Sequence, residues 1–182
     1  MNQQLFIATA NGLVTGERDE AGWKAGQRML EGQALTRLAA SDGARIAGTR
    51  DGIYRSTDRG QNWVEASDGL TTRYVRALTA HPTLPGLVFA GTEPAAIFVS
   101  RDGGKTWREA PEIAHLRYMH GWFLPYSPGA GCIRAFTDEL LAILSNGELY
   151  GTRLPTLIWR RLLPAIPNIS AVVGLPFDSA TG

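Results

Sequence analysis

One eight-residue pattern occurs twice in this sequence and constrains the fold more than any other feature. The pattern is Ser-x-Asp-x-Gly-x-x-Trp, and its second copy lies 44 residues after the first. Recurrence at a period of about 40–50 residues is typical of arrays of small sheets, such as β-propellers with four strands in each blade. The two copies consist of Ser56, Asp58, Gly60 and Trp63, and of Ser100, Asp102, Gly104 and Trp107.

Tryptophans at related positions extend this repeat over most of the chain. Trp23, Trp63, Trp107 and Trp159 are separated by 40, 44 and 52 residues. The segments between them are short, apolar and separated by turn residues, and none shows a long helical periodicity. We therefore predict an all-β chain whose complete repeat units cover residues 34–66, 74–110 and 132–163.

The two ends of the chain predict how the array closes. Residues 5–27 match only the second, third and fourth strands of a unit, and residues 168–174 match a first strand. An open array would leave an unpaired strand at each end. We predict a single β-propeller domain over residues 1–182, with four antiparallel four-stranded blades and the C-terminal strand closing the N-terminal blade. The alternatives are a larger ring built from two chains and a shortened form of a longer propeller.

The repeated pattern resembles the Asp box, or BNR repeat, of sialidases, related glycosidases, sortilin-type receptors and photosystem assembly propellers. This resemblance implies that the pattern lies between the third and fourth strands of a blade, on the side away from the ligand. There a short Asp side chain accepts backbone N–H groups, Gly permits a positive φ, and Trp buries apolar surface. We interpret Asp58 and Asp102 as structural groups rather than catalytic acids, and we predict no catalytic residue.

Composition narrows the classes of partner. The net charge is +1, and no basic block is present, so nucleic acid is not expected as a partner. Cys132 is the single cysteine, which excludes an internal disulfide and fits a reducing compartment. The N-terminus lacks the features of a signal peptide, and no apolar run approaches the ~18 residues that span a membrane. We expect a cytoplasmic protein without membrane contact, as a monomer or homodimer.

The longest link between units, residues 111–131, is rich in aromatic and cationic side chains. Long loops in compact domains are usually functional or disordered, and Trp122 is the one tryptophan that the repeat does not explain. We predict that this link binds a sugar or a peptide; the alternative is that its aromatics pack on the ring. His115 and His120 alone are a weak metal pattern, so no metal or cofactor is expected. The predicted binding residues are Arg117, Tyr118, His120 and Trp122.

Three arginines align on the first strands of the complete units. Arg37, Arg76 and Arg134 occupy the aligned position, and Ser170 occupies it in the closing strand. First strands surround the axis of a propeller, where clustered guanidinium groups require an anion or carboxylates. We predict an anion-binding mouth with Arg73 and Arg50 at its rim. The alternative is that each arginine pairs with an acid or with carbonyls of a neighbouring blade and serves packing.

Two functions remain from different classes. The favoured one is a non-catalytic module that binds a protein segment or a small anionic or carbohydrate ligand through the face around residues 111–131. The alternative is a glycoside hydrolase, sialidase-like or of another Asp-box type, which needs two carboxylates about 5–10 Å apart. Glu93, Glu109 and Glu112 are the available acids, but no spacing pairs them.

Overall fold

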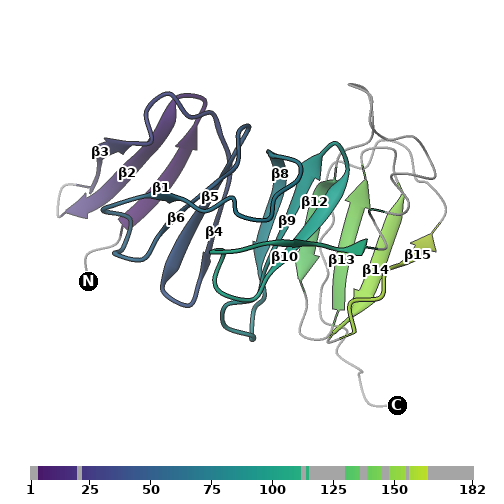
Figure 1. Ribbon diagram of the computed structural model, residues 1–182. Helices are drawn as coiled ribbons and strands as arrows, with labels where there is room; N and C mark the ends of the chain where they lie inside the picture. Colours follow the sequence, from purple (N-terminus) through teal and green to yellow (C-terminus); the bar gives the residue numbers. More distant parts are fainter. Residues whose placement is uncertain are drawn as a thin grey trace, which may run out of the picture.

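The computed structural model describes residues 4–19, 22–111, 114, 130–135, 139–144, 148–154 and 156–163. This part of the chain folds into four separate antiparallel sheets (Figure 1). The predicted all-β fold with four-stranded antiparallel blades is therefore confirmed. Within the described ranges, no helix is long and apolar enough to cross a membrane.

Each sheet is a meander in which consecutive strands are neighbours. The first sheet contains β1 (Gln4–Thr9), β2 (Gly12–Asp19) and β3 (Gly22–Met29). The second contains β4 (Leu35–Ser41), β5 (Ala44–Thr49), β6 (Ile53–Ser56) and β7 (Val64–Glu65). The third contains β8 (Tyr74–Ala80), β9 (Val88–Glu93), β10 (Ala96–Ser100) and β11 (Arg108–Glu109). The fourth contains β12 (Ala130–Ala135), β13 (Glu139–Leu144), β14 (Leu149–Arg153) and β15 (Arg160–Leu163).

The turn between β4 and β5 illustrates how the sequence sets these hairpins. Asp42 and Gly43 both have a positive φ, 48° and 74°. Two left-handed residues in a two-residue loop match the right-handed twist of the flanking strands, and Asp-Gly is a preferred pair for that loop. The hairpin therefore lies where the sequence places its apolar segments, within the predicted unit 34–66.

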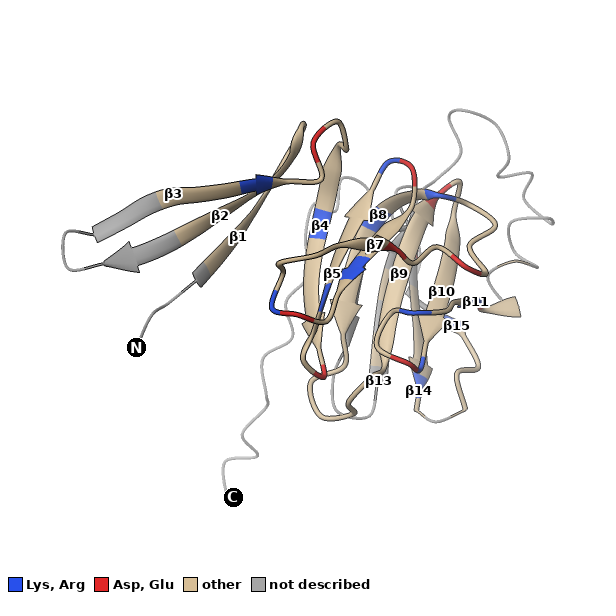
Figure 2. Cartoon of the chain, turned by 60° about the vertical axis from the view of Figure 1, so that its left-hand side comes forward, with Lys and Arg blue, Asp and Glu red and all other residues tan. Residues whose placement is uncertain are grey.

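The first strands of successive sheets lie side by side. The strand β4 is beside β8, and β8 is beside β12, while β1 takes the place next to β4. Figure 1 places the first and fourth sheets at opposite ends of the array, and Figure 2 shows the first sheet standing apart from the others. The predicted closing strand, residues 168–174, lies outside the described residues. Ring closure and the number of blades in the complete ring stay predictions.

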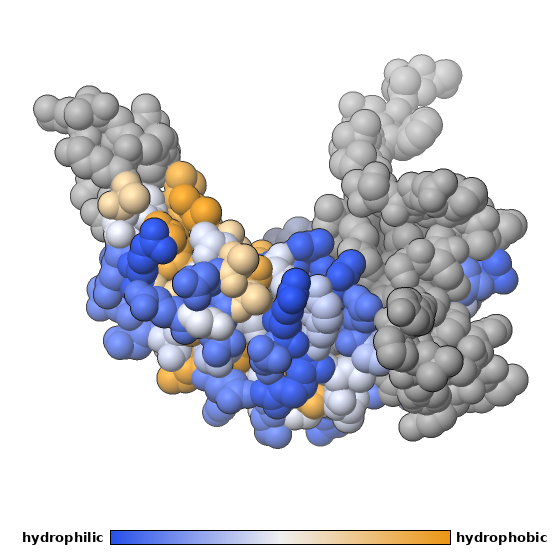
Figure 3. Space-filling model, turned by 90° about the horizontal axis from the view of Figure 1, so that it is seen from above, coloured by the Kyte–Doolittle hydropathy of each residue, from blue (hydrophilic) through white to orange (hydrophobic). Residues whose placement is uncertain are grey.

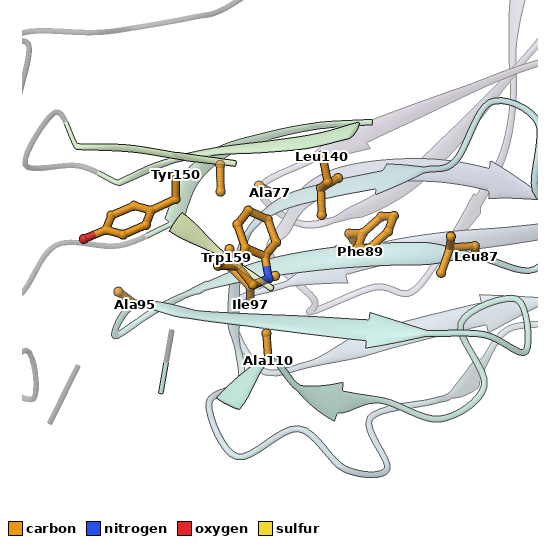
Figure 4. Packing of buried hydrophobic residues seen from close by; sticks show 10 residues of the cluster. Ala77, Leu87, Phe89, Ala95, Ile97, Ala110, Leu140, Tyr150 and Trp159 are labelled. Atoms are coloured by element: carbon orange, nitrogen blue, oxygen red, sulfur yellow. The ribbon is translucent and has the colours of Figure 1, made fainter. Parts of the chain in front are cut away.

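The core lies between sheets rather than within them. One apolar cluster joins the first and second sheets, another the second and third, and another the third and fourth (Figure 4). In β9, Val88 belongs to the cluster shared with the second sheet and Phe89 to the one shared with the fourth, and both are fully buried. A strand covered on both faces requires a continuous apolar run, and residues 88–91 of β9 form one.

Trp107 joins the third sheet to the second. Its Nε1 donates to the Ala66 carbonyl (2.9 Å), and its backbone N–H donates to the Asp68 carbonyl (2.9 Å). The close approach requires Gly69, where a Cβ would lie 1.9 Å from the Trp107 oxygen. This tryptophan therefore bonds to the preceding sheet, in addition to burying apolar surface as predicted.

Trp63 occupies the same pattern position but a different environment. It is half-buried, and its Nε1 donates to Gly60 of its own turn (3.1 Å). Its contact with the first sheet is an edge-to-face packing on Phe6, with ring centroids 6.5 Å apart. The first and second sheets are thus joined without the indole-to-carbonyl bond that joins the second and third.

We predict that Trp107→Ala destabilises the protein by about 3–5 kcal/mol, because it removes a buried aromatic side chain and leaves a cavity. Trp63→Ala should cost less, because that side chain is half-buried and its hydrogen bond stays within one turn. The free energies of unfolding of both variants are measured by urea denaturation monitored by circular dichroism. Val64→Ala is the control, since Val64 is 63% exposed. Equal losses for the two tryptophans would contradict this assignment.

Candidate functional site

The two Asp boxes have the same hydrogen-bonded geometry. Asp58 Oδ1 accepts the Ser56 hydroxyl (2.7 Å) and the N–H groups of Gln61 (3.0 Å) and Asn62 (2.9 Å). In the third sheet, Asp102 Oδ1 accepts the Ser100 hydroxyl (2.7 Å) and the N–H groups of the residues three and four positions later, at 3.0 and 2.9 Å. The serine hydroxyls also accept the N–H of Gly60 and of Gly104, both at 2.8 Å.

These donors keep both carboxylates ionised. The Asn62 N–H, followed by the Ser56 hydroxyl, lowers the pKa of Asp58. Burial alone would raise the pKa of Asp102, but hydrogen bonds from Thr106, Ser100 and Lys105 lower it to about 2. A glycosidase general acid needs a raised pKa so that it is protonated near neutral pH. Neither Asp box carboxylate has that property.

The opposite end of the sheets carries the turns between second and third strands and the links to following sheets, and we call it the mouth face. Here Tyr74, the first residue of β8, lies between two guanidinium groups. Arg50 Cζ is 5.7 Å from the centre of the Tyr74 ring, and Arg76 Cζ is 5.3 Å from it. Arg76 also donates to the Tyr74 hydroxyl (3.1 Å) and pairs with Glu93 (3.3 Å). We call Arg50, Tyr74, Arg76 and Glu93 the Tyr74 cluster.

Arg73 supports this cluster from the side. Its Nε donates to the Asp51 carbonyl (2.7 Å), and its Nη2 pairs with the Glu65 carboxylate. The first of these bonds ties the start of β8 to the β5–β6 turn, which carries Arg50. Arg73 therefore lies on the mouth face, where basic and acidic residues are close together (Figure 2). Its contacts position the turn.

The predicted equivalence of Arg37, Arg76 and Arg134 is wrong. Each first strand has a β-bulge, and the bulged residues are Thr36, Arg76 and Gly131. Arg37 is one residue past its bulge and Arg134 is three past, so the arginines occupy three different register positions. A one-residue shift in a strand moves a side chain to the other face. Alignment by residue identity did not fix that register.

The contacts of these arginines also differ. Arg37 is exposed, and its Nη1 donates to the Thr36 carbonyl (2.7 Å). Arg76 pairs with Glu93 of its own sheet, whereas the packing alternative expected a partner from a neighbouring sheet. The side chain of Arg134 is outside the described part. The predicted loop residues also lie outside it, namely His115, Arg117, Tyr118, His120 and Trp122.

The described residues contain no arrangement suited to binding a metal ion or to catalysis by a pair of carboxylates. No group of three or more His, Cys, Asp or Glu there is placed to hold a metal ion. Glu93 and Glu109 lie on β9 and β11 with β10 between them, and the strand spacings put their backbones about 14 Å apart. Glu109 Oε2 accepts the Thr71 hydroxyl (3.0 Å). Glu112 lies outside the described residues.

Tyr74 is the residue of this site that sequence reasoning missed. The signal available was its position two residues before Arg76 in a predicted strand, with Arg50 already expected at the rim. Residues two apart in a strand ordinarily share a face. The contact with Arg50, which comes from the preceding sheet, depends on how the sheets stack and has no signature in the sequence.

Comparison with known proteins supports the fold. The BNR/Asp-box repeat family matches residues 98–109. Among solved structures, YCF48 from Cyanidioschyzon merolae is similar over 88% of this chain and 52% of its own, with 18% identity and a TM-score of 0.59. A Niastella koreensis GH74 enzyme is similar over 90% of this chain and 29% of its own, with 16% identity and a TM-score of 0.65.

A structure of YCF48 bound to D1 peptide is also similar, with 17% identity and a TM-score of 0.56 over 86% of this chain and 50% of that one. No curated protein matches the sequence. The chain thus spans about half the length of YCF48 and under a third of the GH74 enzyme. At these identities the likeness concerns the fold, and it confirms the resemblance to Asp-box β-propellers.

We predict that Asp102 contributes stability that is lost in acid. Its pKa is lowered from 3.8 to about 2 in the folded protein, so the contribution is present above about pH 4 and disappears as the pH falls towards 2. Asp102→Asn should lower the melting temperature at pH 6 and flatten its dependence between pH 4 and 2. Asp42→Asn, an exposed turn carboxylate outside both Asp boxes, is the control. An unchanged pH profile in Asp102→Asn would contradict the assignment.

Proposed function

We propose that this chain, whose fold is similar to that of Asp-box β-propellers, is a non-catalytic binding module that takes a carboxylate-bearing protein segment at the Tyr74 cluster. One observation carries the proposal. Among the described residues, Arg50 has the Tyr74 ring as its neighbour and no carboxylate partner, whereas Arg76 beside it is paired with Glu93. The Arg50 guanidinium group on the mouth face can therefore bind an anion that a partner supplies.

The chemistry of the site favours a peptide carboxylate. A guanidinium group binds a carboxylate through two parallel hydrogen bonds, and the flat face of Tyr74 offers apolar contact beside it. Loops held on a rigid frame are the usual place for recognition. The likeness to YCF48, whose structure with D1 peptide is known, supports a protein partner. The predicted contribution of residues 111–131 to the same face remains part of this proposal.

A glycoside hydrolase is the second candidate, because a GH74 enzyme has a similar fold. The lowered pKa values of Asp58 and Asp102 and the ion pair of Glu93 are unfavourable for a general acid. We predict no turnover of a panel of aryl β- and α-glycosides, including an aryl sialoside, above a buffer blank. Turnover that is abolished by Glu93→Gln would establish the hydrolase and refute the binding proposal.

We predict that Arg50→Gln weakens binding of acidic peptides by about tenfold or more, the effect of losing one charge-assisted contact. The probe is an array of 15-residue peptides synthesised in pairs, one with Glu and one with Gln at the same positions. The wild-type protein should prefer the Glu members of the pairs.

Lys105→Gln is the matched control, since it removes an exposed positive charge from an Asp-box turn at the opposite end of the sheet. Its binding should equal that of wild type. Equal affinity for both members of the peptide pairs, or equal losses in the Arg50 and Lys105 variants, would reject the Tyr74 cluster as the site.

A further inference from the structure

A pocket of about 520 Å³ lies between the third and fourth sheets, at their outer strands. The third sheet contributes the end of β10 and both residues of β11, and the fourth contributes the turn between β14 and β15. The apolar part of the lining includes Val99, Ala110 and Leu157. The volume is within the range of small-molecule sites, so the origin of the pocket and the charges around it bear on function.

The preceding junction has a side chain where this pocket lies. Arg55 pairs with Val64 in the second sheet, and Val99 pairs with Arg108 in the third, so Arg55 and Val99 are equivalent in register. Across the junction of the second and third sheets, the Arg55 Nε donates to the Gly103 carbonyl (2.8 Å). Val99 has no group that can make this bond to the next sheet. The third sheet therefore leaves this space to other groups.

The turn of the fourth sheet also differs from an Asp box. Counted back from Trp159, Thr156 occupies the place of the motif glycine. In the third sheet that glycine, Gly104, lies against Ile46 of the preceding sheet with no room for a Cβ. Thr156 carries a Cβ, and the left-handed residue among the described residues of this turn is Leu157, with φ of 56°. The fourth turn therefore cannot pack on the sheet before it as closely, and both of its residues line the pocket.

The Trp159 indole carries a second sign of incomplete packing at this junction. Its side chain is buried, at 6% exposure, and its Nε1 has no hydrogen-bond partner among the described residues. At the preceding junction, the equivalent Trp107 Nε1 donates to the Ala66 carbonyl (2.9 Å). Figure 4 shows the Trp159 nitrogen directed towards Ala110, which lines the pocket. A buried N–H without a partner is rare in a completed core.

The charges that line the pocket are not equally available. Arg101 and Arg108 are exposed, and among the described residues neither guanidinium group has a hydrogen bond or an ion pair. The two acids of the lining are already engaged. Asp102 accepts the donors of its own Asp box, and Glu109 accepts the Thr71 hydroxyl (3.0 Å). The available charges of this lining are therefore positive.

We propose that this pocket binds a small organic carboxylate with an apolar body, such as an arylacetate. The body packs on Val99, Ala110 and Leu157, and the carboxylate lies between Arg101 and Arg108, whose planar groups bind carboxylates through paired hydrogen bonds. The described part of the mouth face, seen in Figure 3, is mainly hydrophilic and offers less to an apolar body. The pocket is separate from the Tyr74 cluster, and neither proposal depends on the other.

The first test is a titration of the wild-type protein with three probes of similar shape, namely naphthylacetate, naphthylacetamide and naphthylethylamine. Binding is read from the methyl NMR signals of Val99 and Leu157, so a probe that binds elsewhere does not count. The Val64 methyl groups, on the outer strand of the second sheet, are the control. We expect saturable shifts with naphthylacetate and at least about tenfold weaker binding of the neutral amide.

Three outcomes of this titration overturn the proposal. No shift with any probe means that the pocket is closed or too small. Equal affinity for the amide means that the guanidinium groups are not used. Tighter binding of the amine means that the carboxylates of the lining decide the preference.

The second test uses variants and reads the Leu157 methyl signals. Arg108→Gln should weaken naphthylacetate binding at least about tenfold, whereas Arg59→Gln, at an exposed arginine of the second sheet's Asp-box turn, should leave it unchanged. Val99→Phe fills the pocket and should abolish binding while the melting temperature stays near that of wild type. Equal affinities in the two arginine variants, or full affinity in a folded Val99→Phe protein, overturn the proposal. If Val99→Phe does not fold, the two arginine variants decide.

Discussion

The contact between each sheet and the one before it determines most of this structure. Gly104, with φ of 82°, lies so close to Ile46 of the preceding sheet that a Cβ would be 2.8 Å from the Ile46 Cδ1. Gly60, with φ of 87°, lies in the same relation to Phe6 of the first sheet, at 2.4 Å. The glycine of the Asp box therefore permits close packing as well as a left-handed turn. The turn of each Asp box lies against the preceding sheet.

The Asp boxes act at one end of the sheets, so they have no structural role on the mouth face. The aspartates hold the turns at one end, and the polar groups of the Tyr74 cluster lie at the other. Arg73 ties the β5–β6 turn to the start of β8, so Arg50 and Tyr74 come from different sheets and meet in a fixed relation. A site assembled across a sheet boundary inherits the rigidity of the inter-sheet core beneath it.

Much of the fold follows from sequence, because the 44-residue spacing and the short apolar segments depend on chemistry within each repeat. Strand β8 begins at Tyr74, where the predicted unit 74–110 starts, for this reason. The register of Arg37 and Arg134 could not be predicted from the sequence, because a bulged strand allows alignments that differ by a residue or more with equal apolar content. The unequal burial of Trp63 and Trp107 could not be predicted either. Both fit one motif, and the difference comes from the sheet that each one meets.

Among the described residues, the junction between the first and second sheets has fewer polar contacts than the next junction along the array. An open pocket of about 590 Å³ lies beside the first of these junctions, lined mainly by the β4–β5 hairpin of the second sheet together with Phe6 and Trp63. The Arg45 guanidinium covers the Phe6 ring from 5.1 Å, and the Trp63 indole bonds within its own turn. At the next junction, Trp107 bonds to Ala66 and Arg55 bonds to Gly103 (2.8 Å). Since stability in such arrays is a sum of sheet and neighbour terms, the junction between the first and second sheets should contribute less to the stability of the array than the junction between the second and third.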